Sequence, residues 1–514
     1  MEDIGNVVAV LIGIVWFVLP LILRALRARS EQASSAPIPV LDFAGLSRTV
    51  QHALALCDWI ALENQRLSKR VVAALGPARV LSDVLLRLSE EQTRLRSDVV
   101  AAAEDIQARR PPMTLPDTLA LLEWQRLRLA AVEHMIDVRS DRVLGEMMAD
   151  ADAVAAAHLL PLVEFTQSRG IAFPSRRPVC VPAMPGREAV FFGLLPEGYP
   201  TVFVPSDFGD DLLRWPAVSH EIGHVVWREM PGFARELRRS LDLEVEPLIP
   251  AGPRSFDLRR CYGAWLEELF CDFFAVVLLG PPALRGMTAM FASEAREDLV
   301  WAVAREARYD DHPPPQLRIQ LAAHALWVMG FDAEAKLLLR EWSAKVGEQP
   351  MYGFMALMTP PFGIPSQAVE AFGRTIVERM YDLPFRALHG YSLPVIPGLA
   401  MTPGLWAHVR TEKEALIEGQ VRHKDPRVIL AAAIEARASS SRPSRPMAKA
   451  VARAIVGIDE PRRREAPPEP EHDAPGVRDE ALQAMVLYQV LARRPHGGSR
   501  RPRPGSLRAR GDRL

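Results

Sequence analysis

An uncharged apolar run near the N-terminus constrains this chain more than any other feature. Residues from Ile4 to Leu23 are almost wholly apolar and carry no charge. About 20 such residues in a helix cover the roughly 30 Å of a bilayer's hydrocarbon core, so the run predicts one transmembrane helix in contact with lipid. Arg24, Arg27 and Arg29 follow the run, whereas its other end is acidic. The positive-inside rule therefore predicts a single-pass membrane protein with the rest of the chain in the cytoplasm, and a buried core helix is the alternative.

Composition adds a few exclusions. The chain has 514 residues, which is long enough for several structural units. Its formal net charge is only -1, so no specific nucleic-acid partner is expected. Four cysteines are scattered without a CxxC pair, which predicts buried free thiols rather than a disulfide framework. These cysteines are Cys57, Cys180, Cys261 and Cys271.

The chain divides by composition and periodicity into five segments, which predict a mainly α fold with a small β-sheet (α+β). They are an anchor with its basic flank (1–29), a linker (30–40), a helical region (41–168), a mainly helical domain (171–438) and a largely disordered tail with a short helix near 447–456 (439–514). Within the second of the helical segments, helical periodicity from about 211 to 438 is expected with interruptions. The Arg-rich end of the tail is interpreted as solvated, with contact to anionic lipid or RNA as the alternative.

Two long periodic runs make up most of the N-terminal helical region. Apolar residues three and four apart recur over 81–106 and 118–160, and Pro111 and Pro112 separate the runs. This pattern predicts a long helical hairpin. We interpret it as a spacer or packing layer, and a partner-binding coiled coil is the alternative.

Short β-type runs precede the most informative helix of the chain. They cover 179–181, 189–194 and 201–204. The last run, Val202, Phe203 and Val204, ends at Pro205, which is consistent with an exposed edge strand onto which an extended peptide can add.

The segment Ser219-His220-Glu221-Ile222-Gly223-His224 carries the clearest chemical pattern. Residues four apart lie on one face of a helix, so His220 and His224 can converge on one metal ion. Glu221 is rotated by about 100° from His220, which suits a general base acting on a water rather than a ligand. Catalytic zinc commonly takes three protein ligands, so a third ligand is expected elsewhere in the chain.

Glu268 is the preferred third ligand for one Zn²⁺ per chain. Asp272 lies four residues later on the same helical face, from where it can accept the proton on the far nitrogen of His220. Glu267 is the competitor, but the residue four positions beyond it is Cys271, which offers no such partner. A closed zinc site that uses Cys261 or Cys271 with the two histidines is a further alternative.

Together these motifs resemble the gluzincin clan of zinc peptidases. The pattern His220-Glu221-x-x-His224 is followed by Glu268-x-x-x-Asp272 and then by His312-Pro313-x-x-x-x-Arg318, which is similar to an element of the HtpX-like and CAAX-processing membrane peptidases. The resemblance covers roughly 201–320 and implies a zincin-type catalytic domain. It also implies that His312, with Arg318 as its alternate, stabilises the oxyanion.

The expected activity is therefore zinc-dependent hydrolysis of a protein or peptide substrate. Unlike the HtpX-like peptidases, which carry several membrane spans, this chain shows one. The alternative from another functional class is a catalytically inactive, membrane-tethered scaffold with a structural or degenerate zinc site.

Overall fold

The computed structural model describes most of the chain between the N-terminal run and the tail. The described residues are 42–74, 80–175, 177–183, 194–205, 207–243, 258–292, 300–305, 308–309, 312–356, 359–439 and 446–455. The predicted anchor (4–23) and linker (30–40) lie outside these residues, as does the tail beyond 455. Among the helices that are described, none is both long enough and apolar enough to cross a membrane.

The described residues form two compact units. The first consists of the described residues up to Asp58 together with Thr93–Leu122. The second consists of Trp59–Gln92 and the described residues from Glu123 onward. The helices α2, α3 and α4 each contribute residues to both units, and every residue of the candidate site belongs to the second.

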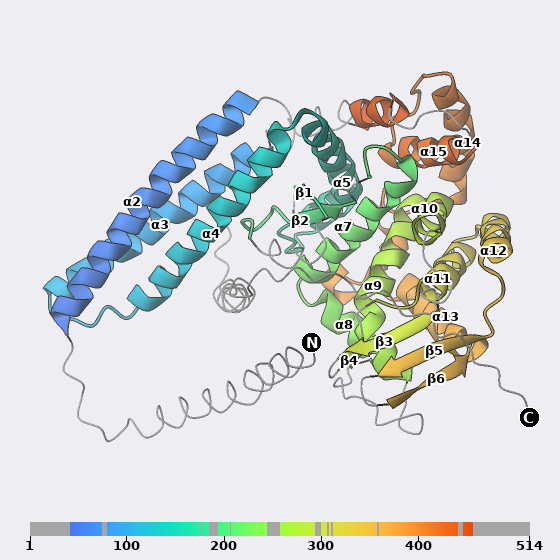
Figure 1. Ribbon diagram of the computed structural model, residues 1–514, viewed down its shortest axis with the longest axis horizontal. Coiled ribbons are helices and arrows are strands. Elements are labelled where there is room, and N and C mark those ends of the chain that lie inside the picture. The colour runs from blue at the N-terminus through green and yellow to red at the C-terminus, as the bar shows by residue number, and fades with distance from the viewer. Residues whose placement is uncertain are drawn as a thin grey trace, which may run out of the picture. The chain divides into compact units, whose positions relative to one another are not determined.

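The described chain is mainly helical, as the sequence predicted, and it contains two small sheets (Figure 1). The helices, including short 3-10 turns (η), are α2 (Phe43–Ala74), α3 (Val80–Gln107), α4 (Leu115–Ser140), α5 (Arg142–Ser168), η2 (Leu212–Arg214), α7 (Pro216–Glu229), α8 (Phe233–Ser240), α9 (Leu258–Leu279), α10 (Pro281–Phe291), α11 (Pro315–Val328), α12 (Asp332–Val346), α13 (Ser366–Asp382), η4 (Arg386–Leu388), η5 (Leu393–Val395), α14 (Pro403–Ile417) and α15 (Pro426–Ala438). The strands are β1 (Val179–Pro182), β2 (Thr201–Val204), β3 (Trp301–Arg305), β4 (Arg308–Tyr309), β5 (Met351–Ala356) and β6 (Thr359–Pro365). Residues 446–455 are also helical, close to the predicted short helix.

The two predicted runs between 81 and 160 contain one more break than their periodicity predicted, and a further helix, α2, precedes them. The break at Pro111 and Pro112 is present, since α3 ends before it and α4 begins after it. The second predicted run, 118–160, is divided at Asp141 into α4 and α5. The Asp141 carboxylate accepts hydrogen bonds from the backbone N–H groups of Val143 and Leu144 at 2.9 and 2.8 Å, so it caps a new helix where the pattern suggested continuity.

The predicted strands before the key helix form a two-stranded parallel sheet. Val179 of β1 is paired with Thr201 of β2, and Pro182 with Val204. The predicted run 189–194 falls outside the described residues except for Leu194, which is not in a strand. In the described chain β2 lies at an edge of this sheet, as predicted, although the side chains of Val202, Phe203 and Val204 are buried.

A four-stranded sheet in the order β4-β3-β5-β6 was not predicted from the sequence. Its strands lie within the segment where helical periodicity was expected with interruptions. Tyr352 and Phe354 alternate inward and are fully buried, whereas Gly353 faces the Trp301 ring, where a Cβ atom would lie 2.5 Å from the ring. β6 carries glycine and proline at alternate positions and β4 has only two residues, so both give a weak sequence signal.

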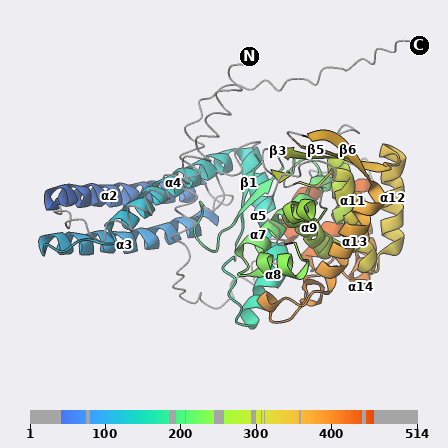
Figure 2. The ribbon, with the colours of Figure 1, turned by 90° about the horizontal axis from the view of Figure 1, so that it is seen from below.

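The helix α7 lies beside α9 in the core of the second unit, and two perpendicular views agree on this arrangement (Figure 1, Figure 2). Large buried side chains surround the pair, among them Trp215 before α7 and Trp265 on α9. All four cysteines are buried thiols, as predicted. Burial of this apolar surface, at about 25 cal/mol per Å², holds the two helices together and thereby positions the side chains between them.

Candidate metal centre

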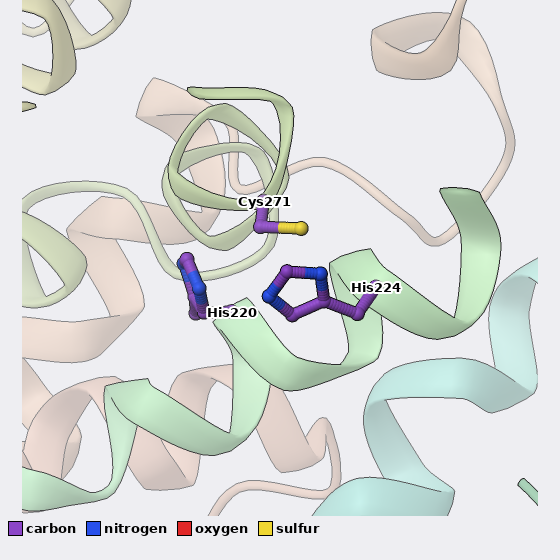
Figure 3. Close-up of side chains that lie close together, drawn as sticks. All are labelled: His220, His224 and Cys271. Carbon is purple, nitrogen blue, oxygen red and sulfur yellow. The ribbon is translucent and has the colours of Figure 1, made fainter. Parts of the chain in front are cut away.

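The helix α7 presents both histidines toward α9. Its opposite face carries Val218, Ile222 and Val225, the apolar stripe expected from the sequence, and all three are buried. The imidazole rings of His220 and His224 lie one turn apart with centroids 5.0 Å from each other and an interplanar angle of 81°. Figure 3 shows both rings on one side of α7, facing the helix that carries Cys271. The spacing of four residues therefore brings the two rings to one site.

A glycine allows α9 to approach α7 closely. A Cβ atom at Gly223 would lie 2.7 Å from the Cα atom of Cys271, which is closer than carbon atoms can pack. Any larger residue between the two histidines would push α9 away. Gly223 therefore sets the short distance across which Glu268 reaches the imidazoles.

The carboxylate of Glu268 faces both histidines at once. Its Oε2 atom lies 3.3 Å from Nε2 of His220, and its Oε1 atom lies 3.2 Å from Nε2 of His224. Ligands bound to a tetrahedral centre at about 2.0–2.1 Å are separated by about 3.3 Å, so both distances fit a shared zinc ion. Cys271 also lies near the pair, since its Sγ atom and one ring nitrogen of each histidine lie within 4.8 Å of one another.

Each histidine also has a carboxylate on its far nitrogen. Nδ1 of His220 lies 2.9 Å from Asp272 Oδ1, the contact that the sequence predicted. Nδ1 of His224 lies 2.8 Å from Glu267 Oε1, a contact that was not predicted from the sequence. When Nδ1–H donates in each contact and a metal ion takes the place of the Nε2 protons, the lone pair of each ring is on Nε2, the atom that lies beside Glu268.

Burial and hydrogen bonding act in opposite directions on these groups. Burial lowers the pKa of His220, but hydrogen bonds to Asp272 and Glu268 outweigh this effect and raise the pKa to about 10. The same balance, with Glu267 and Glu268 as partners, raises the pKa of His224. Burial acts to raise the pKa of Glu268, yet the hydrogen bonds from both imidazoles hold that pKa well below its usual range. The carboxylates thus favour positive charge between the rings, which a divalent cation would supply.

Glu221 lines the same cleft without taking part in this ligand geometry. Burial raises the pKa of its carboxyl group, and the nearby His224 and His220 counteract the increase only in part. A carboxylate with a raised pKa accepts a proton more readily, which suits the expected role of general base.

The two residues of the third motif lie at the site but in different positions. Arg318, on the first turn of α11, is buried and binds Asp272 through two hydrogen bonds of 2.7 Å, from Nε and from Nη2. Its guanidinium carbon also lies 5.3 Å from the centre of the Phe291 ring. His312 is largely exposed, and its Nε2 atom lies 3.5 Å from Glu268 Oε1. His312 therefore faces the open side of the site, whereas Arg318 supports it from behind.

The site opens into a cleft of about 530 Å³. Its lining includes small or apolar residues of α7, α9 and α10, among them Ala217, Ala275 and Met287, and also Arg228 at the end of α7. Phe203 of β2 also lines the cleft, although its side chain is buried. The volume is sufficient for a few residues of an extended peptide.

The role of Glu267 could have been found from the helical wheel of α9. Successive residues are rotated by about 100°, so Glu267 lies on one side of Glu268 and Asp272 lies about 40° to the other side. A carboxylate that reaches between two histidines is therefore flanked by one acid for each. The spacing pattern alone offers Glu267 only as a competing ligand. The end of α7 supplied no signal for Arg228, which binds Glu267 with a 2.7 Å contact.

Comparison with known proteins provides no relative from which a function can be transferred. No protein-family model, no curated protein and no solved structure matches this chain. The functional interpretation therefore depends on the residues and geometry described above.

Proposed function

We propose that this chain is a zinc-dependent endopeptidase of the HExxH type, with His220, His224 and Glu268 as the metal ligands. The observation that carries the proposal is the convergence of two Nε2 atoms on one carboxylate, at 3.3 and 3.2 Å, beside a cleft that Glu221 lines. Two imidazoles and one carboxylate are a known donor set of catalytic zinc. The motifs' resemblance to gluzincins supports the same conclusion.

The chemistry follows from the positions of the chain's own groups. A bound zinc ion supplies a Lewis acid that increases the acidity of a water and polarises a peptide carbonyl. Glu221 takes a proton from the attacking water as the oxygen of that water bonds to the carbonyl carbon. It then delivers that proton to the leaving nitrogen as the C–N bond breaks.

His312 is the better placed of the two proposed oxyanion donors. Its ring faces the cleft near Glu268, whereas Arg318 directs both Nε and Nη2 at Asp272. We therefore assign to His312 the hydrogen bond to the developing oxyanion. Arg318 holds Asp272, which in turn orients His220.

The membrane anchor belongs to the same proposal and rests on the sequence of residues 4–23. A peptidase tethered in this way would act on proteins or peptides at the cytoplasmic side of the bilayer. We also propose that an extended substrate pairs with the backbone of β2. Such pairing uses backbone hydrogen bonds and does not require the strand's side chains, which are buried.

Two variants of the full-length protein test the assignment of base and ligand. Glu221→Gln should retain zinc and reduce peptide hydrolysis by about 10²- to 10⁴-fold, because only the proton acceptor is lost. Glu268→Ala should lose both zinc and activity. Zinc content of the purified chain and newly formed protein N-termini in cells are the measurements. Undiminished proteolysis by Glu221→Gln would refute the base.

Glu378→Gln is a matched control for these acidic substitutions. Glu378 also accepts a hydrogen bond from a histidine, His324, at 2.9 Å, but on α13 and outside the cleft. This variant should resemble the wild type in zinc content and in the profile of N-termini.

The proximity of Cys271 to both histidines favours one competing function, a scaffold with a closed, structural zinc site. Four protein ligands would leave no position for water. In that case Cys271→Ser would release zinc, Glu268→Ala would not, and the N-termini of wild-type and Glu221→Gln cells would be identical. On the peptidase proposal, Cys271→Ser keeps its zinc.

A further inference from the structure

The acid beside the ligand Glu268 contacts the second histidine. Glu267 Oε1 lies 2.8 Å from Nδ1 of His224. The same oxygen accepts a hydrogen bond of 2.9 Å from Nε of Arg228, one turn further along α7. One oxygen atom thus connects an imidazole of the site to a cation that lines the cleft.

Helix geometry explains why Glu267 contacts both His224 and Arg228. His224 and Arg228 are four residues apart, so they lie one above the other on the face of α7 that is turned toward α9. Glu267 lies on the flank of α9 that faces them, because it precedes Glu268 by one residue and is rotated by about 100°. A side chain on this flank is too far around the helix to take the place of Glu268 between the rings.

The charges around Glu267 favour its ionised form. Its Oε1 atom lies 2.8 Å from Nδ1 of His224 and accepts a hydrogen bond of 2.9 Å from Nε of Arg228, so two donors stabilise the carboxylate. The carboxylate is about one quarter exposed, with a side-chain accessibility of 26%. It is therefore an anion that remains close to His224 without being sealed in the core.

We propose that Glu267 is a positioning residue that fixes the tautomer and orientation of His224, with Arg228 holding the carboxylate in place. The proposal rests on the function proposed above, because it assigns the Nε2 lone pair of His224 to the metal. Carboxylates in this relation to a metal-binding histidine typically contribute roughly 10- to 100-fold to metal affinity. Each histidine of the site then has its own acid, Asp272 for His220 and Glu267 for His224.

The test is a titration of the purified full-length protein with zinc against a competing chelator. Glu267→Ala is expected to weaken zinc binding by roughly 10- to 100-fold. Glu267→Gln keeps an oxygen that accepts the hydrogen bond, so it should recover part of that loss. Glu378→Gln, which removes the charge from a histidine–glutamate contact elsewhere, should bind zinc as the wild type does.

A second readout separates positioning from a general effect on folding. With cobalt in place of zinc, the visible absorption spectrum reports the geometry of the ligands. Glu267→Ala should change this spectrum, and Glu267→Gln should restore it toward that of the wild type. The thermal unfolding of the metal-free variants should remain close to that of the metal-free wild type.

The outcomes distinguish this inference from the proposed function. Complete loss of zinc in Glu267→Ala, equal to that in Glu268→Ala, would make Glu267 a ligand and overturn the inference. Unchanged affinity and an unchanged cobalt spectrum would overturn it as well, while the peptidase proposal would stand. A wild-type chain that binds no zinc would overturn both. If the zinc affinities follow the expected order but neither the wild type nor any variant hydrolyses peptides, the proposed function is refuted and the role of Glu267 in metal binding stands.

Discussion

His220 and His224 belong to one motif and one helix, yet their surroundings differ. On the His220 side, Asp272 is paired with Arg318, whose side chain is only 8% exposed. On the His224 side, Glu267 is paired with Arg228, whose side chain is 40% exposed. The first carboxylate–arginine pair is therefore part of the core, and the second lies at the edge of the cleft.

The difference indicates that the two histidines of one motif have surroundings that contribute differently to folding and to metal binding. A buried ion pair is costly to disrupt because a single unpaired charge remains in a medium of low polarity. An exposed pair contributes little to folding, since water and salt replace the lost partner. We infer that the contacts on the His220 side affect both zinc binding and the free energy of unfolding. The contacts on the His224 side affect mainly zinc binding.

Removal of Arg318 should give the largest effect on folding. Arg318→Met removes the guanidinium that donates two hydrogen bonds to the buried Asp272 and leaves only the contact with His220, so we expect the free energy of unfolding to fall by about 3–5 kcal/mol. Denaturant titration of the metal-free protein measures this change. A loss as small as that of Arg228→Met would show that the two sides do not differ in the proposed way.

Enlargement of Gly223 should affect both sides together. In Gly223→Ala the new Cβ atom would meet the backbone of Cys271 at 2.7 Å, so α9 must move away from α7. We expect a loss of about 1–3 kcal/mol in the free energy of unfolding, together with weaker zinc binding. Gly404→Ala is the matched control, because its nearest neighbour would be Thr402 Oγ1 at 3.7 Å. Normal zinc affinity in Gly223→Ala would contradict the role given to this close contact.

Removal of Arg228 should give the smallest change in stability. Arg228→Met should lower the free energy of unfolding by about 0–1 kcal/mol, since the pair is exposed. Zinc binding should weaken by less than in Glu267→Ala and should depend less on salt than in the wild type, because salt screens the exposed pair. Measurement of zinc affinity at low and high ionic strength would detect this. A destabilisation as large as that of Arg318→Met would remove the contrast between the two sides.

Part of the site could be predicted from the sequence because it depends on local geometry. The four-residue spacing of His220 and His224 places both rings on one face of any helix, and the spacing of Glu268 and Asp272 does the same. The buried stripe of α7 and the strands β1 and β2 followed from equally short patterns, whereas the parallel pairing of the two strands did not. The division at Asp141 and the four-stranded sheet did not, because periodicity alone does not show where a cap or a glycine-containing strand interrupts a run.

The sequence by itself determined which residue types can meet a metal, and on which helical faces they lie. Only the tertiary structure decided that Glu268 reaches between the rings, that Glu267 takes His224, and that Arg318 binds Asp272 while His312 faces the cleft. These choices depend on the separation and relative rotation of α7 and α9, and on the approach of α11. Such quantities are set by contacts between residues far apart in the chain, such as Gly223 against Cys271, and not by spacing within one helix.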